Sequence, residues 1–209
     1  MSLAMIGAGN VGAALGRAWL QAGEDVLFGV PEPSDPKYRA LPQDRMRRPA
    51  EAARDAEVIV LATPWPATEA AVKGLGDLSG KMIIDCTNPL GSGSDGLELV
   101  LGHHISGGER VASWAPGVSV FKSFNQTGAE NMAAASQFPV RPVMFVAGDD
   151  EARKPAVLAL IAKIGFDAID AGPLRNARLL EPLGMLWIDQ ALKRGHGTNF
   201  AFAVTRRNG

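Results

Sequence analysis

The stretch LAMIGAGNVGAALGRAWLQAG, Leu3 to Gly23, decides the fold of this chain. Leu3–Ile6 is an apolar run of strand length, and apolar residues at helical spacing follow the glycines. Between the two lie Gly7, Gly9 and Gly12 in G-x-G-x-x-G spacing. A strand that leads into a glycine turn and a helix that leaves it are typical of the first unit of a dinucleotide-binding fold.

Each glycine of this turn has a physical task in such a fold. The first allows a tight turn, the second lets the backbone approach a pyrophosphate, and the third lets helix and strand pack closely. The helix N-terminus adds free N–H groups and a partial positive charge. We therefore predict that Gly7, Gly9 and Gly12 form a dinucleotide-binding turn. The alternative is a strand–turn–helix that only needs small residues.

The rest of the chain continues the alternation of strands and helices. We expect strands at residues 25–30, 57–64, 81–89, 118–125, 142–150 and 167–172, and helices at 49–56, 67–73, 109–115, 151–165 and 175–194. Short apolar strands that alternate with helices indicate an α/β fold with a doubly wound, mostly parallel sheet of the Rossmann type. No linker divides the chain, so we expect one domain over 1–209, with 174–209 as a C-terminal extension that contains a long helix.

Composition narrows the class of protein. The chain has 209 residues, 46% of them hydrophobic, and a net charge of −1. This charge gives no reason to expect nucleic acid or an anionic membrane as a partner. A lone cysteine, Cys86, and no recognisable signal peptide favour the reducing cytoplasm. The apolar stretches are too short to cross a bilayer.

The adenosine end of the site is expected about 20 positions after the glycine turn, where an acidic residue would favour NAD. Gly29 and Val30 stand there instead and leave room for a 2′-phosphate. The proline-rich segment 31–48 that follows contains five cations: Lys37, Arg39, Arg45, Arg47 and Arg48. Either this loop curls over the adenosine with one or two cations on the phosphate, or it is an ordinary solvated loop. We expect NADP rather than NAD, with Gly29, Val30 and Lys37 in the site.

Several ordered stretches carry a resemblance to a known family. They read IGAGNVGAALG, VIVLATPW, IIDCTNPL, VFKSFNQTGAENM, VAGDD and DAGPLRNARLLEPLGML. In these the chain resembles the NADPH-dependent coenzyme F420 (deazaflavin) reductases, and it is similar to the oxidoreductase domain of the STEAP metalloreductases. The closing NFAFAVTRR is similar to the family's final strand, so we expect a short strand there.

The resemblance implies places for the cofactor. Residues 7–11 would hold the pyrophosphate, which adds Asn10 and Val11 to the glycines. Residues 62–65 would lie along it, which adds Ala62, Thr63 and Pro64, and residues 87–90 would lie beside the nicotinamide, which adds Asn88 and Pro89. Relatives usually have an Arg just after the glycine of the second strand. Here Pro31 takes that position, which puts the usual phosphate clamp in doubt.

The sequence contains no pattern for a metal site, a nucleophile or a catalytic acid. His103, His104 and His196 lack metal-ligand spacing with Cys86 or with carboxylates. Hydride transfer between two planar rings does not require such groups, since the cofactors carry the chemistry. Side chains that orient the rings by packing would suffice: Trp65, Leu90, Phe124, Asn125 and Met132 are the pocket candidates. Each apolar one is equally a core candidate, and Asn125 could instead bond its own turn.

We therefore predict an NADP(H)-dependent oxidoreductase whose second substrate is F420, a flavin or a similar small-molecule acceptor. Two alternatives remain: a reductase of small carbonyls or imines, and a non-catalytic redox sensor that holds NADP. Reductases of the first kind add an all-helical domain, for which little chain remains after Gly172. Membrane metal reduction is not expected, because no transmembrane haem domain follows. The leucine-rich helix 175–194 either packs on its own sheet or forms a homodimer contact, as the resemblance implies, with the partner's tail at the pocket.

Overall fold

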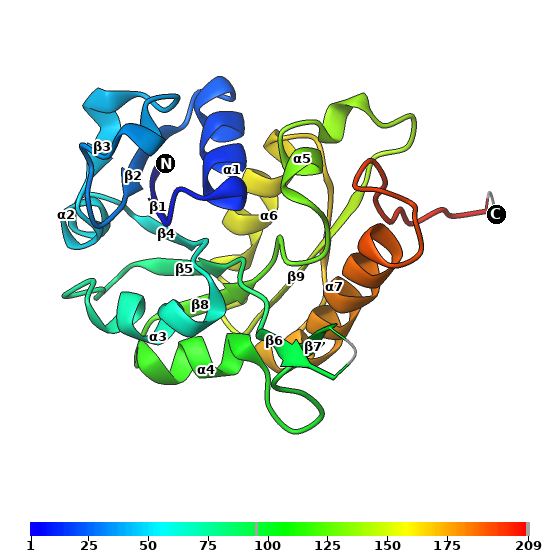
Figure 1. The fold of residues 1–209 in the computed structure, drawn as a ribbon. Helices are drawn as coiled ribbons and strands as arrows, with labels where there is room; N and C mark the ends of the chain where they lie inside the picture. The colour runs from blue at the N-terminus through cyan, green and yellow to red at the C-terminus, as the bar shows by residue number, and fades with distance from the viewer. Residues whose placement is uncertain (95, 208–209) are drawn as a thin grey trace.

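The computed structural model describes residues 1–94 and 96–207, and its centre is an eight-stranded sheet with helices on both faces (Figure 1). The strands of this sheet are β1 (Ser2–Ile6), β2 (Asp25–Gly29), β3 (Met46–Arg47), β4 (Val58–Leu61), β5 (Met82–Asp85), β8 (Ser119–Lys122), β9 (Val143–Gly148) and β10 (Asp167–Asp170). The helices are α1 (Asn10–Gln21), α2 (Pro49–Arg54), α3 (Trp65–Lys73), α4 (Gly107–Trp114), α5 (Ala129–Met132), α6 (Lys154–Lys163) and α7 (Ala177–Leu192).

The strand order is β10-β9-β8-β5-β4-β1-β2-β3. From β3 to β8 all neighbours are parallel, and the chain leaves β1 toward β2 on one side and returns to β4 on the other. This is the doubly wound order, with its switch point between β1 and β4. The predicted fold class, a mostly parallel Rossmann-type sheet with a long C-terminal helix, is confirmed.

The sheet reverses direction once, at β9. This strand pairs antiparallel with β8, with Phe121 opposite Gly148, while β10 runs parallel to β9. The carboxyl ends of β9 and β10 therefore lie at the edge of the sheet that is opposite to the carboxyl ends of the other six strands.

The core has two layers because successive strand residues face opposite sides of the sheet. On one face Met5 and Val60 pack under α1, α5 and α6, and the Trp19 indole of α1 donates to the Leu160 carbonyl (3.0 Å). On the other face Ala4 and Ile59 pack under α2, α3 and α4. Buried strands of this kind read as continuous apolar runs, which is why the sequence predicted them well.

Three parts of the structure differ from the expectations. The segment 31–48 contains two 3-10 helices, Pro36–Tyr38 and Gln43–Arg45, and the short edge strand β3. The short strands β6 (Leu90–Gly93) and β7 (Gly96–Leu99) pair antiparallel, which was not predicted. The predicted final strand is wrong, since residues 199–207 have no strand assignment.

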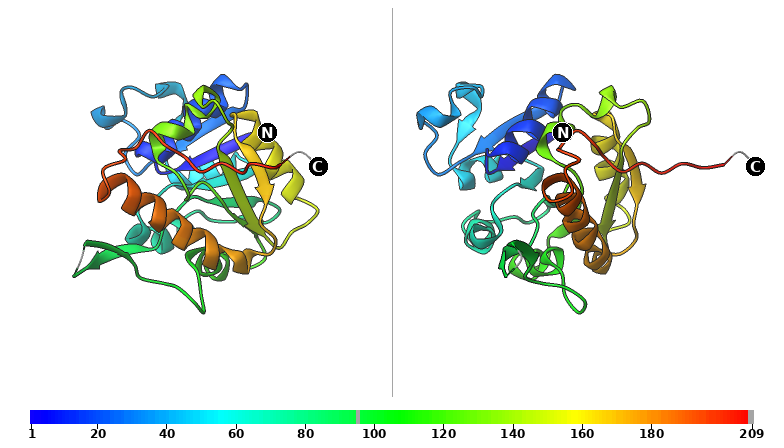
Figure 2. Two further views of the ribbon diagram at one scale, coloured as in Figure 1. Left: turned by 90° about the vertical axis from the view of Figure 1, so that its right-hand side faces the viewer. Right: turned by 45° about the vertical axis from the view of Figure 1, so that its right-hand side comes forward.

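The tail nevertheless has a defined path past the end of α7 (Figure 2). The Trp187 indole donates to the Phe200 carbonyl (2.9 Å), and the two rings stack with centroids 5.2 Å apart. The Val143 N–H donates to the Phe202 carbonyl (2.9 Å), a single bond of the kind that a strand would repeat. Side-chain contacts thus hold this segment where a ladder was expected. Nowhere in residues 1–94 and 96–207 does a helix combine the length and the apolar character that a membrane span needs.

Candidate functional site: a cleft at the carboxyl ends of the strands

Hydrogen bonds between neighbouring strands continue one residue beyond the strand ends. The N–H groups of Gly7, Ala62 and Cys86 donate to the carbonyls of Gly29, Ile6 and Leu61, at 2.9–3.0 Å. The loops after β1, β4 and β5 therefore leave the sheet side by side at one edge. This is the edge at which open α/β sheets bind ligands.

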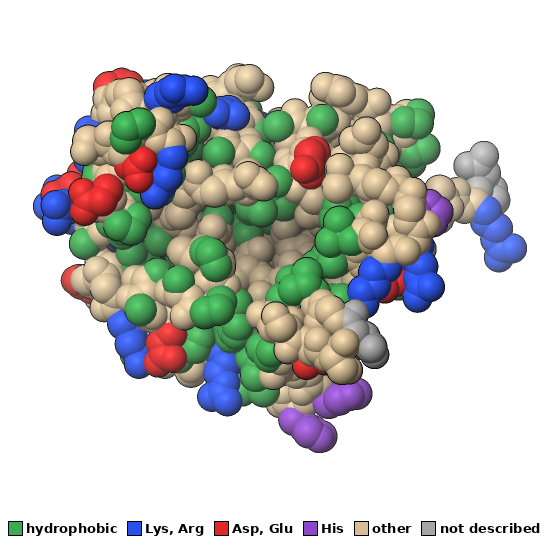
Figure 3. Space-filling view, viewed as in Figure 1, with side chains coloured by type: hydrophobic (Ala, Val, Ile, Leu, Met, Phe, Trp, Pro, Cys, Tyr) green, Lys and Arg blue, Asp and Glu red, His purple; other side chains and the backbone are tan. Residues whose placement is uncertain are grey.

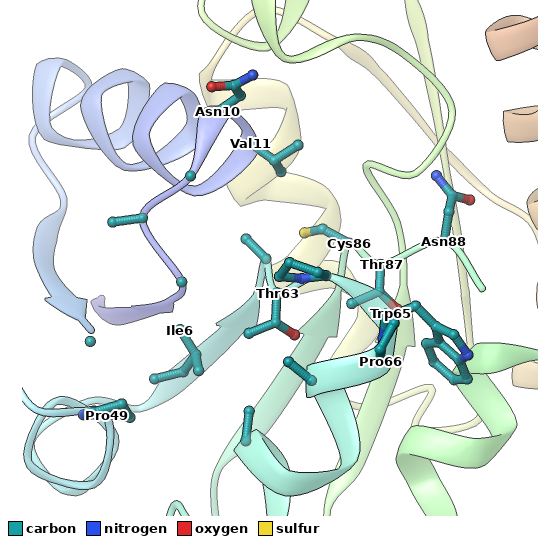
Figure 4. A pocket seen from close by; sticks show the side chains of 18 of the residues that line it. Ile6, Asn10, Val11, Pro49, Thr63, Trp65, Pro66, Cys86, Thr87 and Asn88 are labelled. Carbon is teal, nitrogen blue, oxygen red and sulfur yellow. The ribbon is translucent and has the colours of Figure 1, made fainter. Parts of the chain in front are cut away.

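A cleft of about 830 Å³ lies over this edge, beside the switch point (Figure 4). Its floor is the glycine turn, and its walls are the loops after β4 and β5 on one side and the β2–α2 region on the other. Hydrophobic side chains surround the hollow on the face that Figure 3 shows. Of the predicted site residues, those that line the cleft are Gly7, Gly9, Asn10, Val11, Gly29, Ala62, Thr63, Pro64, Trp65, Asn88 and Leu90.

The three motif glycines have different reasons for being glycine. Gly7 has φ +96°, and an added Cβ would come within 2.7 Å of the Ala62 carbonyl oxygen. A Cβ on Gly12 would collide with the Gly7 carbonyl oxygen. Gly9 has an ordinary φ of −73°, and a Cβ there would meet no atom within 4 Å. No contact within the described chain therefore requires glycine at position 9, whereas a ligand on the floor of the cleft would.

Gly9 is also the N-cap of α1, so the first backbone N–H groups of the helix point at this floor. These groups have no intrahelical partner and carry the positive end of the helix dipole. The Gly9 carbonyl accepts from the Ala13 N–H (2.8 Å), which fixes the start of the helix. The residues present fit a diphosphate at this point.

The β2 end of the cleft differs from the expectation in detail. A Cβ on Gly29 would meet Pro49 Cα at 3.1 Å and Ala52 Cβ at 3.2 Å, so the packing of α2 leaves little room for a side chain here. Val30 is fully buried in the core and does not line the cleft. Lys37 does not line it either, and its exposed ammonium pairs with Asp35 (2.8 Å).

The apolar wall after β4 is held by local contacts. The hydroxyls of Thr63 and Thr68 lie 2.9 Å apart, and the Thr68 hydroxyl donates to the Pro64 carbonyl (3.1 Å). The Trp65 ring packs on the Trp114 ring of α4 with centroids 5.5 Å apart. The indole is therefore part of a fixed wall.

The opposite end of the cleft is ordered by two asparagines. Asn88 Nδ2 donates to the Asn125 carbonyl (2.9 Å), and Asn125 Nδ2 donates to Asn88 Oδ1 (3.2 Å) and to the Leu180 carbonyl (2.8 Å). A Cβ on Gly184 would collide with the Asn125 carbonyl, so α7 approaches this pair closely. Asn125 is buried and orients Asn88, which lines the cleft.

Some predicted pocket residues belong to the core instead. Phe124 and Met132 are about 1% exposed, and Pro89 is buried beneath the cleft lining. Phe124 has φ +58°, and edge-to-face contacts with Trp19 and Phe166 fix it there. A left-handed residue of this kind costs about 1–2 kcal/mol.

Other lining residues were not singled out individually, although Thr87 falls in the segment 87–90 that the resemblance places beside the nicotinamide. Tyr38 and Pro49 line the β2 end, and Cys86 and Thr87 follow β5. Burial raises the pKa of the Cys86 thiol well above its usual value, so this thiol stays protonated at neutral pH. Across the described ranges, no three side chains of His, Cys, Asp or Glu come together in a way that would hold a metal ion.

The charge of the cleft is its most informative property. In the part of the chain that the structure describes, no Asp, Glu, His, Lys or Arg lines it. Its polar groups include backbone amides, the hydroxyls of Thr63, Thr87 and Tyr38, the side-chain amides of Asn10 and Asn88, the Trp65 indole and the Cys86 thiol. Such a cleft binds and orients planar groups, and it offers no strong acid or base to a substrate.

Comparisons with known proteins agree with this geometry. Residues 2–89 match the family described as NADP oxidoreductase, coenzyme F420-dependent. The chain is 29% identical over 216 residues to the F420-dependent NADP reductase of Methanothermobacter marburgensis, covering 92% of this chain and 93% of that protein. It is 27% identical over 186 residues to the metalloreductase STEAP3 of Rattus norvegicus, covering 87% of this chain and 36% of the rat protein.

A solved structure of a candidate F420-dependent NADP reductase from an Arthrobacter species superposes with a TM-score of 0.89. It is 28% identical and covers 98% of this chain, while this chain covers 99% of it. The resemblance predicted from the short motifs is thereby confirmed over nearly the full length.

Proposed function

We propose that this chain, a relative of the coenzyme F420-dependent NADP oxidoreductases, transfers a hydride between NADP(H) and a deazaflavin or flavin-like acceptor. The observation that carries the proposal is the uncharged cleft, which runs from the β2 end past the glycine turn to residues 86–90. When bound, NADPH supplies the hydride and the acceptor takes it up with a proton, which leaves NADP⁺ and the reduced acceptor. The protein then has to hold the two reacting carbons about 3–3.5 Å apart and to exclude water.

The residues divide this task along the cleft. The α1 N-terminus at Gly9 would hold the diphosphate, and Tyr38 and Pro49 would flank the adenosine. Asn88 and the Trp65 wall would border the nicotinamide and the acceptor ring. No lining side chain acts as an obligatory proton donor, which suits ring-to-ring hydride transfer better than reduction of a carbonyl or imine.

The 2′-phosphate of NADP needs a cation at the β2 rim of the cleft. We propose a different residue for this contact from the Lys37 that was expected on sequence. Lys37 is paired with Asp35, whereas Arg39 and Arg48 form no ion pair with any described residue. Arg48 directly precedes Pro49 of the cleft lining. We assign the phosphate contact to Arg48.

The test is a titration with NADPH followed by addition of F420 or FMN, recording the loss of NADPH and of the oxidised acceptor. We expect a 1:1 exchange with the deazaflavin. Arg48→Ala should weaken NADPH by about tenfold or more, since hydrogen bonds to charged groups contribute about 1.5–3 kcal/mol. The same variant should leave NADH unchanged, and Lys37→Ala should affect neither nucleotide. NADPH binding without turnover of any deazaflavin or flavin would favour the redox sensor, and turnover of imines instead would favour the other alternative.

We also propose that the protein forms a homodimer through α7. Leu179 and Leu186 on this helix are 68% and 49% exposed, and Leu97 of the neighbouring strand β7 is 42% exposed. Large exposed leucines that cluster on one helix mark an association surface. Light scattering of the wild type should give twice the mass of the chain, and Leu179→Asp with Leu186→Asp should give a monomer.

A further inference from the structure

A fully buried ionic cluster lies directly beneath the Thr87–Asn88 end of the cleft. Lys122 Nζ is 2.9 Å from Asp85 Oδ2 and 3.0 Å from Glu181 Oε1, and all three side chains are at most 2% exposed. Burial alone would lower the pKa of Lys122, but the attraction of the two carboxylates outweighs it and raises that pKa. The lysine is therefore charged at every physiological pH.

This cluster forms hydrogen bonds with the backbone N–H, the carbonyl and the hydroxyl of Thr87. Lys122 Nζ donates to the Thr87 carbonyl (2.6 Å). Asp85 Oδ1 accepts from the Thr87 N–H (2.9 Å) and from its hydroxyl (2.7 Å). Three hydrogen bonds from two buried side chains converge on this one residue of the cleft lining, so its position is fixed to within the tolerance of those bonds.

The third member connects the cluster to the helices. The Glu181 carboxylate on α7 accepts from the N–H groups of Gly107 (2.9 Å) and Gly108 (3.1 Å) at the start of α4. The helix N-terminus offsets the surplus negative charge of the two carboxylates. The strands β5 and β8 and the helices α4 and α7 are thus joined at one lysine.

Replacing a buried ion cluster by apolar residues is often neutral or stabilising, so stability alone does not account for this one. Three of its hydrogen bonds end on Thr87, in a segment that would border the reacting end of the cleft. We propose that Lys122 is a positioning residue, which fixes Thr87 and Asn88 so that the nicotinamide ring is held for hydride transfer. This inference rests on the proposed function.

The chain offers a matched control in a second buried lysine. Lys154 is 1% exposed, and its ammonium pairs with Glu151 (2.6 Å) and Asp170 (3.1 Å). Asp170 ends β10, whose carboxyl end lies at the edge of the sheet opposite to the cleft. Both lysine side chains are thus buried and paired with two carboxylates, but the partners of Lys154 reach solvent (73% and 43% exposed) and lie away from the cleft.

The experiment compares Lys122→Met with Lys154→Met in the full chain. Charge-balanced doubles, Lys122→Met with Glu181→Gln and Lys154→Met with Asp170→Asn, keep the comparison valid if a single variant does not fold. For each protein, fluorescence titration measures the affinity for NADPH and for 2′,5′-ADP, which lacks the nicotinamide. Stopped-flow measures hydride transfer to the acceptor.

For the Lys122 variants we expect the preference for NADPH over 2′,5′-ADP to fall about tenfold. The hydride-transfer rate should fall about tenfold to a hundredfold, because a displacement of the reacting ring by about 1 Å slows transfer by that much. The affinity for 2′,5′-ADP should stay within about twofold, and the Lys154 variants should keep both quantities.

Folded Lys122 variants with unchanged preference and rate would overturn the inference. Equal losses in both lysine series, or folding failure confined to both Lys122 variants, would also overturn it, because the cluster would then serve stability. A wild type that binds NADPH but reduces no deazaflavin or flavin would refute the proposed function, while the NADPH preference would still decide the role of Lys122. A wild type without NADPH binding would overturn both.

Discussion

Replacing Gly9 by alanine should separate nucleotide binding from folding. The added Cβ meets no protein atom within 4 Å, and the backbone at φ −73° is one that alanine adopts freely. Alanine is a poorer N-cap than glycine, but it restricts the unfolded chain more. These two effects oppose each other and are each about 1 kcal/mol or less, so the free energy of unfolding should stay within about 1 kcal/mol of the wild type.

Nucleotide binding should respond much more strongly. The methyl group would lie on the floor of the cleft, between the diphosphate and the N–H groups of α1. Loss of one hydrogen bond to a charged group costs about 1.5–3 kcal/mol. We therefore expect the Kd for NADPH to rise about 10- to 150-fold.

The assay pairs fluorescence titration with thermal unfolding. Gly9→Ala should shift Tm by less than about 4 °C, since 1 kcal/mol corresponds to about 2–4 °C in a chain of this length. Gly12→Ala is the contrasting variant, because its Cβ collides with the Gly7 carbonyl oxygen and should lower Tm by more than that. If folded Gly9→Ala bound NADPH as tightly as the wild type, the assignment of the diphosphate to this turn would be refuted.

Three further predictions follow from single contacts. Gly29→Asp, the substitution that would imitate an NAD enzyme, should lower Tm and confer no NADH preference, because its Cβ would press on Pro49 Cα (3.1 Å) and Ala52 Cβ (3.2 Å) of α2; gain of NADH activity in a stable protein would contradict this. The Arg178 guanidinium holds the pKa of Glu109 below its usual 4.5 in the native state. The stabilisation from this ion pair is therefore lost as pH falls from 4.5 through the lowered pKa. Glu109→Gln should remove this acid-dependent loss of Tm, and parallel Tm–pH curves for variant and wild type would refute the prediction. Phe200→Ala should lower the free energy of unfolding by about 1–2 kcal/mol through loss of its stack on Trp187, and an unchanged urea midpoint would show that the tail is unattached.

The elements that could be predicted from sequence are those with local causes. The apolar runs of β1, β4 and β5 and the glycine turn determine the parallel sheet and the place of the cleft. The pairing of β6 and β7 escaped prediction because residues 90–99 show no apolar alternation. The final strand was expected from resemblance, but in the structure Phe200 packs on Trp187.

The assignment of individual site residues depended on contacts that are distant in sequence. Val30 and Met132 have apolar side chains that suit a pocket and a core equally, and only the packed sheet places them in the core. The role of Lys122 depends on carboxylates 37 positions before it, at Asp85, and on α7, at Glu181. No spacing rule in the chain connects these three positions.

The reversal of the sheet at β9 gives the molecule a side that is free of the cleft. The turns at residues 149–153 and 171–173 leave the sheet at that opposite edge. A surface cysteine engineered there would tether the protein to an electrode with its cleft open to solution. Current could then be recorded from an immobilised film without any linker crossing the path of the nucleotide.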